Sequence, residues 1–169
     1  MCCEKPATQH AGLKNEVFIM NPTITKTLIG GLVGTLLMSL MMQFAAPMMI
    51  GRPMDIAALL GNMMGGIYAL GMGAHILLGV VVFPLLYSAL LFHLLPGAPW
   101  LKGLLFGTLL WLIAATLVMP MAGAGFFMSA IGGIKAAMAA LLGHWVYGLM
   151  LGAIAGGSSC QHCHSHASL

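Results

Sequence analysis

Charged side chains are almost absent from most of this chain, and their scarcity constrains its fold more than any other feature. After Asp55 the next charged residue is Lys102, the next is Lys135, and none follows. Charged residues make up 5% of the 169 residues and hydrophobic residues 60%, whereas about a quarter of the residues in a soluble domain are charged. Such a chain cannot cover itself with a hydrated surface, so we expect it to lie in a lipid bilayer.

The uncharged stretches have the length of transmembrane helices. A helix needs ~20 apolar residues to cross a bilayer core, and the cost of unpaired backbone groups in lipid disfavours an open strand. We therefore predict an all-α, polytopic membrane protein. Its four predicted spans are residues 27–49, 69–94, 102–122 and 134–156. The predicted domains are a polar N-terminal tail, 1–26, the four-helix transmembrane domain, 27–157, and a Cys/His-rich tail, 158–169.

Helix-breaking and capping residues set the limits of the predicted spans. Pro47 and Pro120 are predicted to end the first and third spans, because proline cannot continue a helix. Between the first two spans, the stretch RPMDIAALLG predicts a short helix at the membrane interface. Asp55 is its predicted N-cap, and Gly61 is the residue expected to follow its last turn.

Glycines recur every four residues in three of the predicted spans. Such patterns let helix backbones approach closely in lipid, so we expect these positions to be helix contacts. The glycines are Gly30/Gly34, Gly103/Gly107 and Gly148/Gly152/Gly156.

The two halves of the membrane domain also share sequence motifs. The letters GTLL occur at Gly34–Leu37 and again at Gly107–Leu110, and Pro-Met follows at the same offset in both halves. The second predicted span of each half carries H-x-x-x-G, beginning at His75 and at His144. These matches predict two tandem helical hairpins with pseudo-two-fold symmetry about the membrane normal, as in transporters with parallel repeats.

His75 and His144 are candidate site residues, because ionisable groups in a membrane are costly and normally face the bundle interior. If the two rings face each other, they resemble the axial ligands of a b-type haem, which would then be the cofactor. The alternative is that each is a neutral histidine that donates a hydrogen bond to a neighbouring helix.

The distribution of basic residues predicts the orientation in the membrane. Four lie on one predicted side and two on the other: Lys5, Lys14, Lys26 and Lys102 against Arg52 and Lys135. The side with four is predicted to be cytoplasmic. Residues 1–22 contain no apolar core typical of a signal peptide. We therefore predict a protein of the bacterial inner membrane with both termini in the cytoplasm.

The C-terminal stretch CQHCHSH contains five residues that can bind a metal: Cys160, His162, Cys163, His164 and His166. Thiolates and imidazoles suit Cu(I) and Zn(II). The stretch also has the haem c spacing C-x-x-C-H, but haem c is attached outside the cytoplasm and so short a tail has no pocket for a porphyrin. A copper or zinc ion is the predicted ligand, and the alternative is a tail that is merely rich in these residues.

Two further groups of sulfur-containing residues extend the metal hypothesis. Cys2 and Cys3 lie in the N-terminal tail, in the same predicted compartment as the C-terminal motif, which suggests a joint site. The chain also has 16 methionines, several of which gather toward the predicted outer side, among them Met48 and Met121. Thioethers hold Cu(I) well, although methionine also fills irregular cores.

Two resemblances follow from these motifs. The methionines, the GxxxG patterns and His162-Cys163-His164 resemble copper transporters of the Ctr type, although those have three spans and an M-x-x-x-M span that is not clear here. Over residues 27–157 the chain looks like a family of small bacterial four-helix membrane proteins of unknown function. That resemblance implies four helices and no known activity, and the Cys/His tails lie outside it. It is carried by His75-x-x-x-Gly79, PGAPWLKGLLFG, MPMAGAG and HWVYGLMLG.

Three hypotheses about function follow. No predicted span contains an acidic residue, and there is neither a pair of carboxylates nor a phosphate-binding loop, so we expect no enzyme. No basic patch is dense enough for nucleic acid. The first hypothesis is a membrane protein that transports or delivers a soft metal ion, with copper as the best match. The second is a bis-histidine haem protein in electron transfer or sensing. The third is a structural accessory subunit of a larger membrane complex, without a site of its own. The expected partners are the lipid bilayer and either further copies of the chain, in a homo-oligomer, or a larger membrane complex.

Overall fold

The computed structural model describes residues 24–94 and 97–156, and within these ranges every regular element is helical. Four helical segments in these ranges are long and apolar enough to cross a membrane. They are span 1 (Ile24–Ile50), span 2 (Tyr68–Leu90), span 3 (Pro99–Met121) and span 4 (Gly133–Gly156). The predicted all-α, four-span fold is confirmed, and its limits lie within four residues of the predicted ones.

Short interruptions divide the first three spans. Span 1 consists of α1 (Ile24–Phe44) and α2 (Ala46–Ile50). Span 2 consists of α4 (Tyr68–Leu77), the π-helical η1 (Leu78–Val82), α5 (Phe83–Leu86) and the π-helical η2 (Tyr87–Leu91), which leads into α6 (Phe92–Leu94). Span 3 consists of α7 (Pro99–Ile113), the π-helical η3 (Ala114–Val118) and α8 (Met119–Met121). Span 4 is the single helix α9 (Gly133–Gly156), while α3 (Ile56–Met63) and the 3-10 helix η4 (Phe126–Met128) lie in connections.

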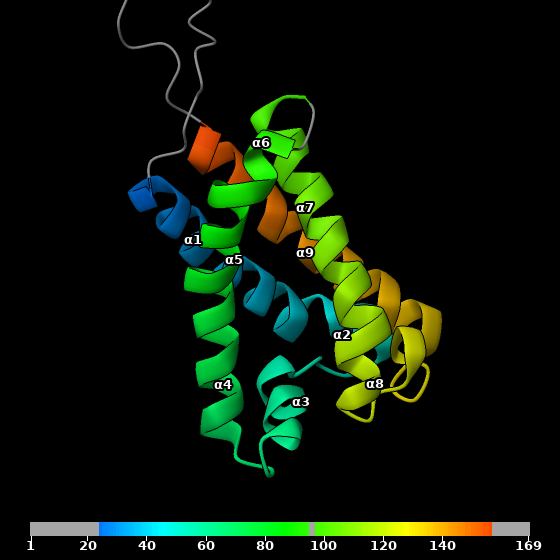
Figure 1. Ribbon diagram of the computed structural model, residues 1–169. Helices are drawn as coiled ribbons and strands as arrows, with labels where there is room; N and C mark the ends of the chain where they lie inside the picture. The colour runs from blue at the N-terminus through cyan, green and yellow to red at the C-terminus, as the bar shows by residue number, and fades with distance from the viewer. Residues whose placement is uncertain (1–23, 95–96, 157–169) are drawn as a thin grey trace, which may run out of the picture.

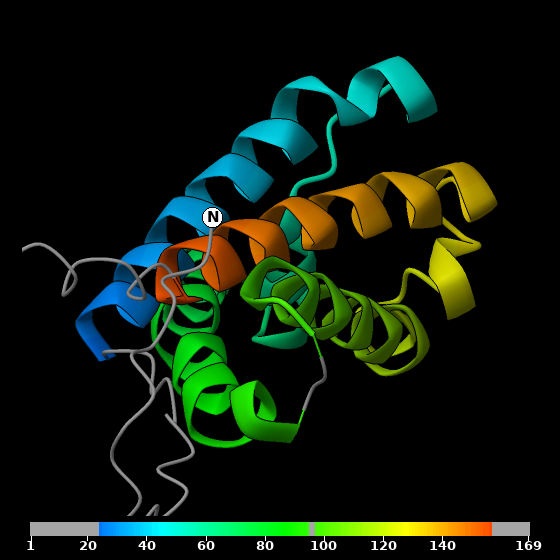
Figure 2. The same cartoon turned by 90° about the horizontal axis from the view of Figure 1, so that it is seen from above.

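Helix α9 lies between α1 and α7 and contacts both along much of its length (Figures 1 and 2). Span 2 packs on α1, and its η2 segment also contacts α7. The start of α1 and the end of α9 lie at one end of the bundle, beside α6, and α3 packs on α4 at the other end (Figure 1). We call these the tail end and the α3 end. The duplication into two hairpins stays a prediction.

Glycines bring α1 and α7 into backbone contact with α9. A Cβ atom on Gly103 would collide with the Gly148 carbonyl oxygen, and one on Gly34 would lie 2.9 Å from the Tyr147 carbonyl oxygen. Cβ atoms almost never approach another heavy atom so closely. The remaining predicted glycines likewise lie at contacts between α9 and either α1 or α7. The predicted glycine contacts are confirmed.

The short helix predicted between the first two spans is present as α3. Its N-cap is Asp55, whose carboxylate accepts a hydrogen bond of 2.9 Å from the Ala58 backbone N–H. The prediction that Gly61 follows its last turn is wrong, because the helix continues to Met63. Gly61 instead lies where α3 meets α4: a Cβ there would be 2.9 Å from the Ile67 carbonyl oxygen. The absence of a side chain at Gly61 lets α3 and the start of α4 approach closely.

Pro47 does not end span 1 as predicted. The helix is interrupted at Ala45, and Pro47 lies in the first turn of α2. Proline is well accommodated there, since the first N–H groups of a helix have no partner within it. Gly51, with a left-handed φ of 76°, ends α2 instead. Pro120, by contrast, lies in the last turn of span 3, close to the predicted end.

Prolines also explain two of the π-helical segments. Segment η1 ends at Val82, two residues before Pro84. The N–H of Phe83, the next residue, donates to the Leu78 carbonyl five residues back. The same pattern precedes Pro120 at the end of η3. A proline ring offers no N–H and crowds the carbonyl four residues before it, so the preceding turn widens. Widened turns of this kind free carbonyl groups inside the bundle.

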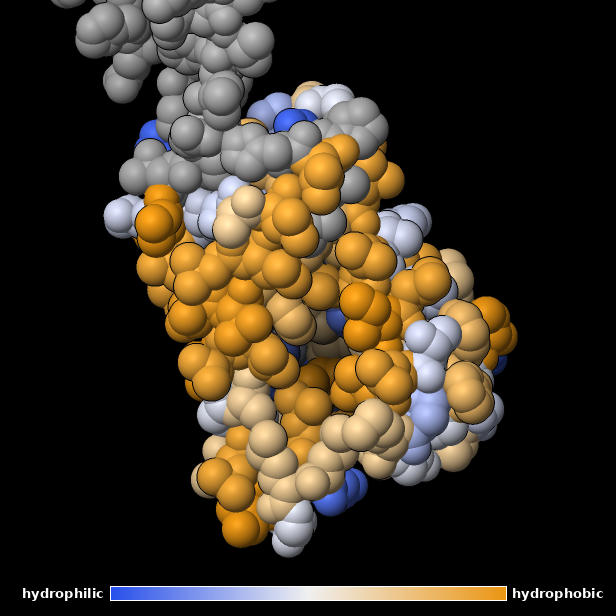
Figure 3. All heavy atoms as spheres, in the orientation of Figure 1, coloured by the Kyte–Doolittle hydropathy of each residue, from blue (hydrophilic) through white to orange (hydrophobic). Residues whose placement is uncertain are grey.

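The outer surface of the spans is apolar, as a bilayer requires (Figure 3). Exposed leucine, isoleucine and valine side chains cover spans 1 to 3 in particular. Half-exposed aromatic rings mark the two ends of the bundle, with Trp100 at the start of α7 and Tyr68 at the start of α4. Trp and Tyr are enriched at membrane interfaces. The apolar surface is consistent with a location in a lipid bilayer.

We expect Gly103→Ala to destabilise the bundle by about 1–3 kcal/mol, the usual cost of overpacking, because the added methyl group must separate α7 from α9. Gly73→Ala is the matched control, since a Cβ at Gly73 on α4 meets nothing within 4 Å. The free energy of unfolding in mixed detergent micelles measures both effects. Equal stability of the two variants would contradict the proposed backbone contact.

Candidate functional site

The structure brings His75 and His144 to the wall of one cavity. His75 lies in α4, near the α3 end of span 2, and His144 lies at the middle of α9. The cavity has a volume of about 200 Å³ and is lined by residues of all four spans and of α3. We call it the lateral cavity, because it is the hollow in the apolar face between spans 2 and 3 (Figure 3).

His144 presents one unprotonated nitrogen to this cavity. Its Nδ1 lies 2.8 Å from the Ala140 carbonyl oxygen. A carbonyl only accepts hydrogen bonds, so in the neutral ring Nδ1 carries the proton and Nε2 has a free lone pair. In the described part of the chain, every fully buried side-chain nitrogen or oxygen has a hydrogen-bond partner. Nε2 of His144 has no partner, so it is not fully buried, and it is accessible from the lateral cavity that His144 lines. His144 is therefore a hydrogen-bond acceptor or a ligand for a cation.

His75 has the opposite tautomer. Its Nε2 lies 3.0 Å from the Ser39 hydroxyl oxygen, and the Ser39 hydroxyl donates to the Thr35 carbonyl oxygen at 2.8 Å. Because a hydroxyl has one hydrogen, the His75 Nε2–H must be the donor to Ser39. The free lone pair of His75 is thus on Nδ1. Ser39 holds the orientation of this ring, as residues behind a metal-binding histidine commonly do.

The hydroxyl groups in the wall of the lateral cavity also donate their hydrogens to protein oxygens. Tyr147 donates to the Gly79 carbonyl oxygen at 2.8 Å, and Thr35 donates to the Gly31 carbonyl oxygen at 2.7 Å. The Gly79 carbonyl needs this partner because Pro84, the residue five positions later, has no N–H to offer it. Every polar side chain in the cavity wall therefore offers only acceptors to a ligand.

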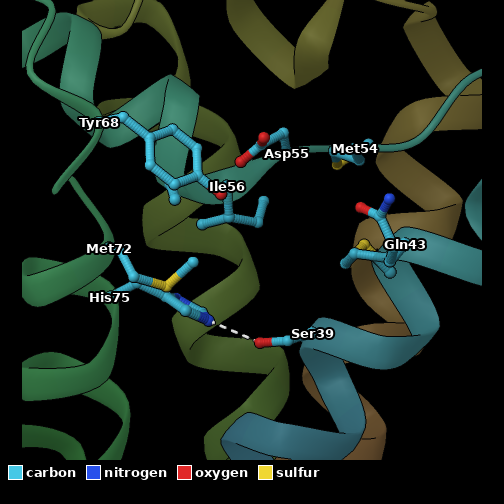
Figure 4. Close-up of a pocket in the computed structure, with 10 residues that line it drawn as sticks. Ser39, Gln43, Met54, Asp55, Ile56, Tyr68, Met72 and His75 are labelled. Atoms are coloured by element: carbon cyan, nitrogen blue, oxygen red, sulfur yellow. Dashed lines mark hydrogen bonds between the residues drawn. The ribbon is translucent and has the colours of Figure 1, made fainter.

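A second, smaller pocket lies beside the lateral cavity, toward the α3 end, and shares His75 with it (Figure 4). Its volume is about 90 Å³, and three methionines line it together with His75. They are Met42 of α1, Met54 before α3 and Met72 of α4. We call it the methionine pocket. Figure 4 shows the Met72 side chain beside the His75 ring, one turn along the same helix.

Asp55 adds a negative charge to the wall of the methionine pocket. It is the single acidic residue in 24–94 and 97–156, and its carboxylate also caps α3. In Figure 4 Tyr68 lies on the same side of the pocket as Asp55. A carboxylate at the wall of an otherwise uncharged pocket attracts cations.

The methionines that the sequence suggested are not the ones that line this pocket. Met48 is 88% exposed on α2 and Met121 is 64% exposed on α8, and neither lines the lateral cavity or the methionine pocket. Met42 and Met54 are almost fully buried. The spacing M-x-x-H from Met72 to His75 is a signal that sequence reasoning could have used. The contribution of Met54 depends on how the connection before α3 folds back, which no local pattern encodes.

The remaining predicted ligands cannot be placed. Cys2 and Cys3 fall in residues 1–23 and the CQHCHSH motif in residues 157–169, both outside the described residues. Within 24–94 and 97–156, no three His, Cys, Asp or Glu side chains come together as a metal site.

Comparison with known protein families identifies the family of this chain. A model of a family of unknown function, DUF6789, matches residues 22–166. The chain belongs to this family. The match reaches beyond the predicted 27–157 and includes the positions Cys160 to His166, while Cys2 and Cys3 remain outside it. The chain matches no curated protein and no solved structure.

A haem between His75 and His144 does not fit this geometry well. The lateral cavity, at about 200 Å³, is smaller than the ~300–1,000 Å³ of typical ligand pockets. His75 would also have to bind iron through Nδ1, because Ser39 occupies its Nε2. We therefore do not propose haem as the cofactor.

Proposed function

We propose that this protein binds a soft metal ion in the membrane, with Cu(I) as its cargo, and that it transports or delivers that ion. The observation that carries the proposal is the convergence of Met42, Met54, Met72 and His75 on one small pocket. Thioether sulfur and imidazole nitrogen are a ligand set that favours Cu(I).

The surroundings of the methionine pocket suit a monovalent ion. Thioethers are uncharged, so they can lie at membrane depth without the cost that a thiolate or carboxylate would bring. A volume of about 90 Å³ is ample for a single metal ion, since ~10–15 Å³ is already enough for one water. Ser39 leaves Nδ1 of His75 free for the ion, and Asp55 supplies one compensating charge. Zn(II), which prefers thiolates and imidazoles, fits the Cys/His tail better than it fits this pocket.

The proposed orientation places the methionine pocket toward the outside of a bacterial inner membrane. Lys26 is near the start of α1 and Lys102 is near the start of α7, which lie at the tail end, and Lys5 and Lys14 precede Lys26 in the sequence. Arg52 shares a pocket with Asp55 and Leu59 of the α3 region, and Lys135 is near the start of α9, at the other end from its tail end. The positive-inside rule then makes the tail end cytoplasmic. The ion would pass between a thioether seat near the outer side and Cys/His ligands in the cytoplasm.

We expect Met72→Leu and Met54→Leu each to weaken Cu(I) binding about tenfold, a loss of ~1.4 kcal/mol, because leucine keeps the volume but removes the sulfur. The measurement is a Cu(I) titration of purified protein against a competing chelator. A background of Cys2→Ser, Cys3→Ser, Cys160→Ser and Cys163→Ser removes all four thiols of the chain. Met48→Leu, at an exposed position, should leave the affinity unchanged.

Unchanged affinity in Met72→Leu and Met54→Leu would contradict the proposed copper seat, that is, the binding of Cu(I) in the methionine pocket. If instead no copper binds to the parent protein, the accessory-subunit hypothesis becomes the better one.

The orientation has a separate test. Alkaline phosphatase, which is active only outside the cytoplasm, should be active when fused after Gly65, in the exposed turn between α3 and α4. It should be inactive when fused after Leu169. Activity at Leu169 would place the C-terminal tail outside, and the C-x-x-C-H spacing would then have to be considered as a haem c site.

A further inference from the structure

We propose that the lateral cavity binds a lipid-soluble phenol, meaning a hydroxylated aromatic ring with an apolar tail, whose hydroxyl donates a hydrogen bond to Nε2 of His144. This site adjoins the copper seat and shares the His75 ring with it, but the other groups that define the two sites differ. His144 does not line the methionine pocket, and Met42, Met54 and Met72 do not line the lateral cavity.

The polar groups of the cavity select a ligand that carries a hydrogen-bond donor. The hydrogens of Thr35, Tyr147, His75 and His144 are all bonded to protein oxygens. A ketone or ester would bring another acceptor against these acceptors and would leave its own oxygen unsatisfied in an apolar space. A hydroxyl supplies the missing donor. Of the two imidazole lone pairs without a partner, Nδ1 of His75 is the one assigned to copper, which leaves Nε2 of His144 as the acceptor for this hydroxyl.

The size and lining of the cavity favour an aromatic ring. A dry cavity of ~150 Å³ lined by leucine, isoleucine and phenylalanine is known to take up benzene, and the lateral cavity has about 200 Å³. Its apolar wall includes Phe83 and Leu86 from span 2 and Ile113 and Val118 from span 3. A ring with one hydroxyl fills such a space and buries its apolar faces.

The position of the opening indicates how the ligand enters. The hollow lies in the apolar face of the bundle, between spans 2 and 3, with hydrophilic atoms at its floor (Figure 3). These spans meet near η2, toward the tail end, so the opening faces the lipid on the side of the bundle. A ligand dissolved in the bilayer can reach His144 without crossing water, and its tail can remain among the lipids.

The test compares a phenol with its methyl ether. Protein in lipid nanodiscs is equilibrated with para-hexylphenol or para-hexylanisole, and the uptake by protein-free nanodiscs is subtracted. We expect the phenol to bind about tenfold more tightly than the ether, because the ether has no hydrogen to donate. His144→Phe should bind both compounds equally, at the level of the ether, because its ring fills similar space without an acceptor.

A second pair of variants keeps the proposal testable if His144→Phe does not fold. Ala114 lines the cavity and Ala153 lies on the exposed side of α9. Ala114→Phe should abolish binding of both compounds, whereas Ala153→Phe should change neither. Equal binding of phenol and ether by the wild type, or unchanged phenol binding in Ala114→Phe, would overturn the proposal. Since His144 and Ala114 do not line the methionine pocket, these outcomes are independent of those for copper.

Discussion

The close approach of α1 and α7 to α9 is the contact on which the rest of the structure depends. Glycines on all three helices let backbones touch where side chains would otherwise keep them apart. In lipid, where no hydrophobic force drives helices together, such close packing is a main source of association. Span 2, which packs on α1 and diverges from span 3 toward the α3 end, then leaves the lateral cavity beside α9. The cavity thus results from dense packing on one side of the bundle and sparse packing on the other.

The hydrogen bonds inside the bundle determine which ligands its interior can bind. Pro84 leaves the Gly79 carbonyl without a backbone partner, and the Tyr147 hydroxyl supplies the missing hydrogen. The ring N–H groups of His75 and His144 likewise donate hydrogen bonds to protein oxygens. What remains unpaired in the interior is a set of lone pairs: two imidazole nitrogens and the thioethers of the methionine pocket. Such an interior favours electron-pair acceptors, either a soft cation or a hydroxyl hydrogen, and both proposals follow from this one property.

The sequence was sufficient for those features that depend on local pattern. Uncharged stretches predicted the spans, the four-residue spacing of Gly103 and Gly107 predicted a helix contact, and Asp55 predicted the start of α3. Features that depend on tertiary contact were missed. Gly61 has the pattern of a helix end but serves the contact between α3 and α4. Met48 has the composition of a metal ligand but points away from the bundle, since the face of a residue on so short a helix depends on how that helix docks.

The most direct test of the central claim is nitrogen NMR of the protein labelled at histidine, at about pH 8, where imidazoles are normally neutral. Signals of His75 and His144 can be assigned by their loss in His75→Gln and His144→Gln. We expect His144 to carry its proton on Nδ1 and His75 to carry its proton on Nε2, so that one bare nitrogen of each ring is available to a ligand. A proton on Nε2 of His144 and on Nδ1 of His75 would mean that the interior offers donors, which would contradict both the copper seat and the phenol site.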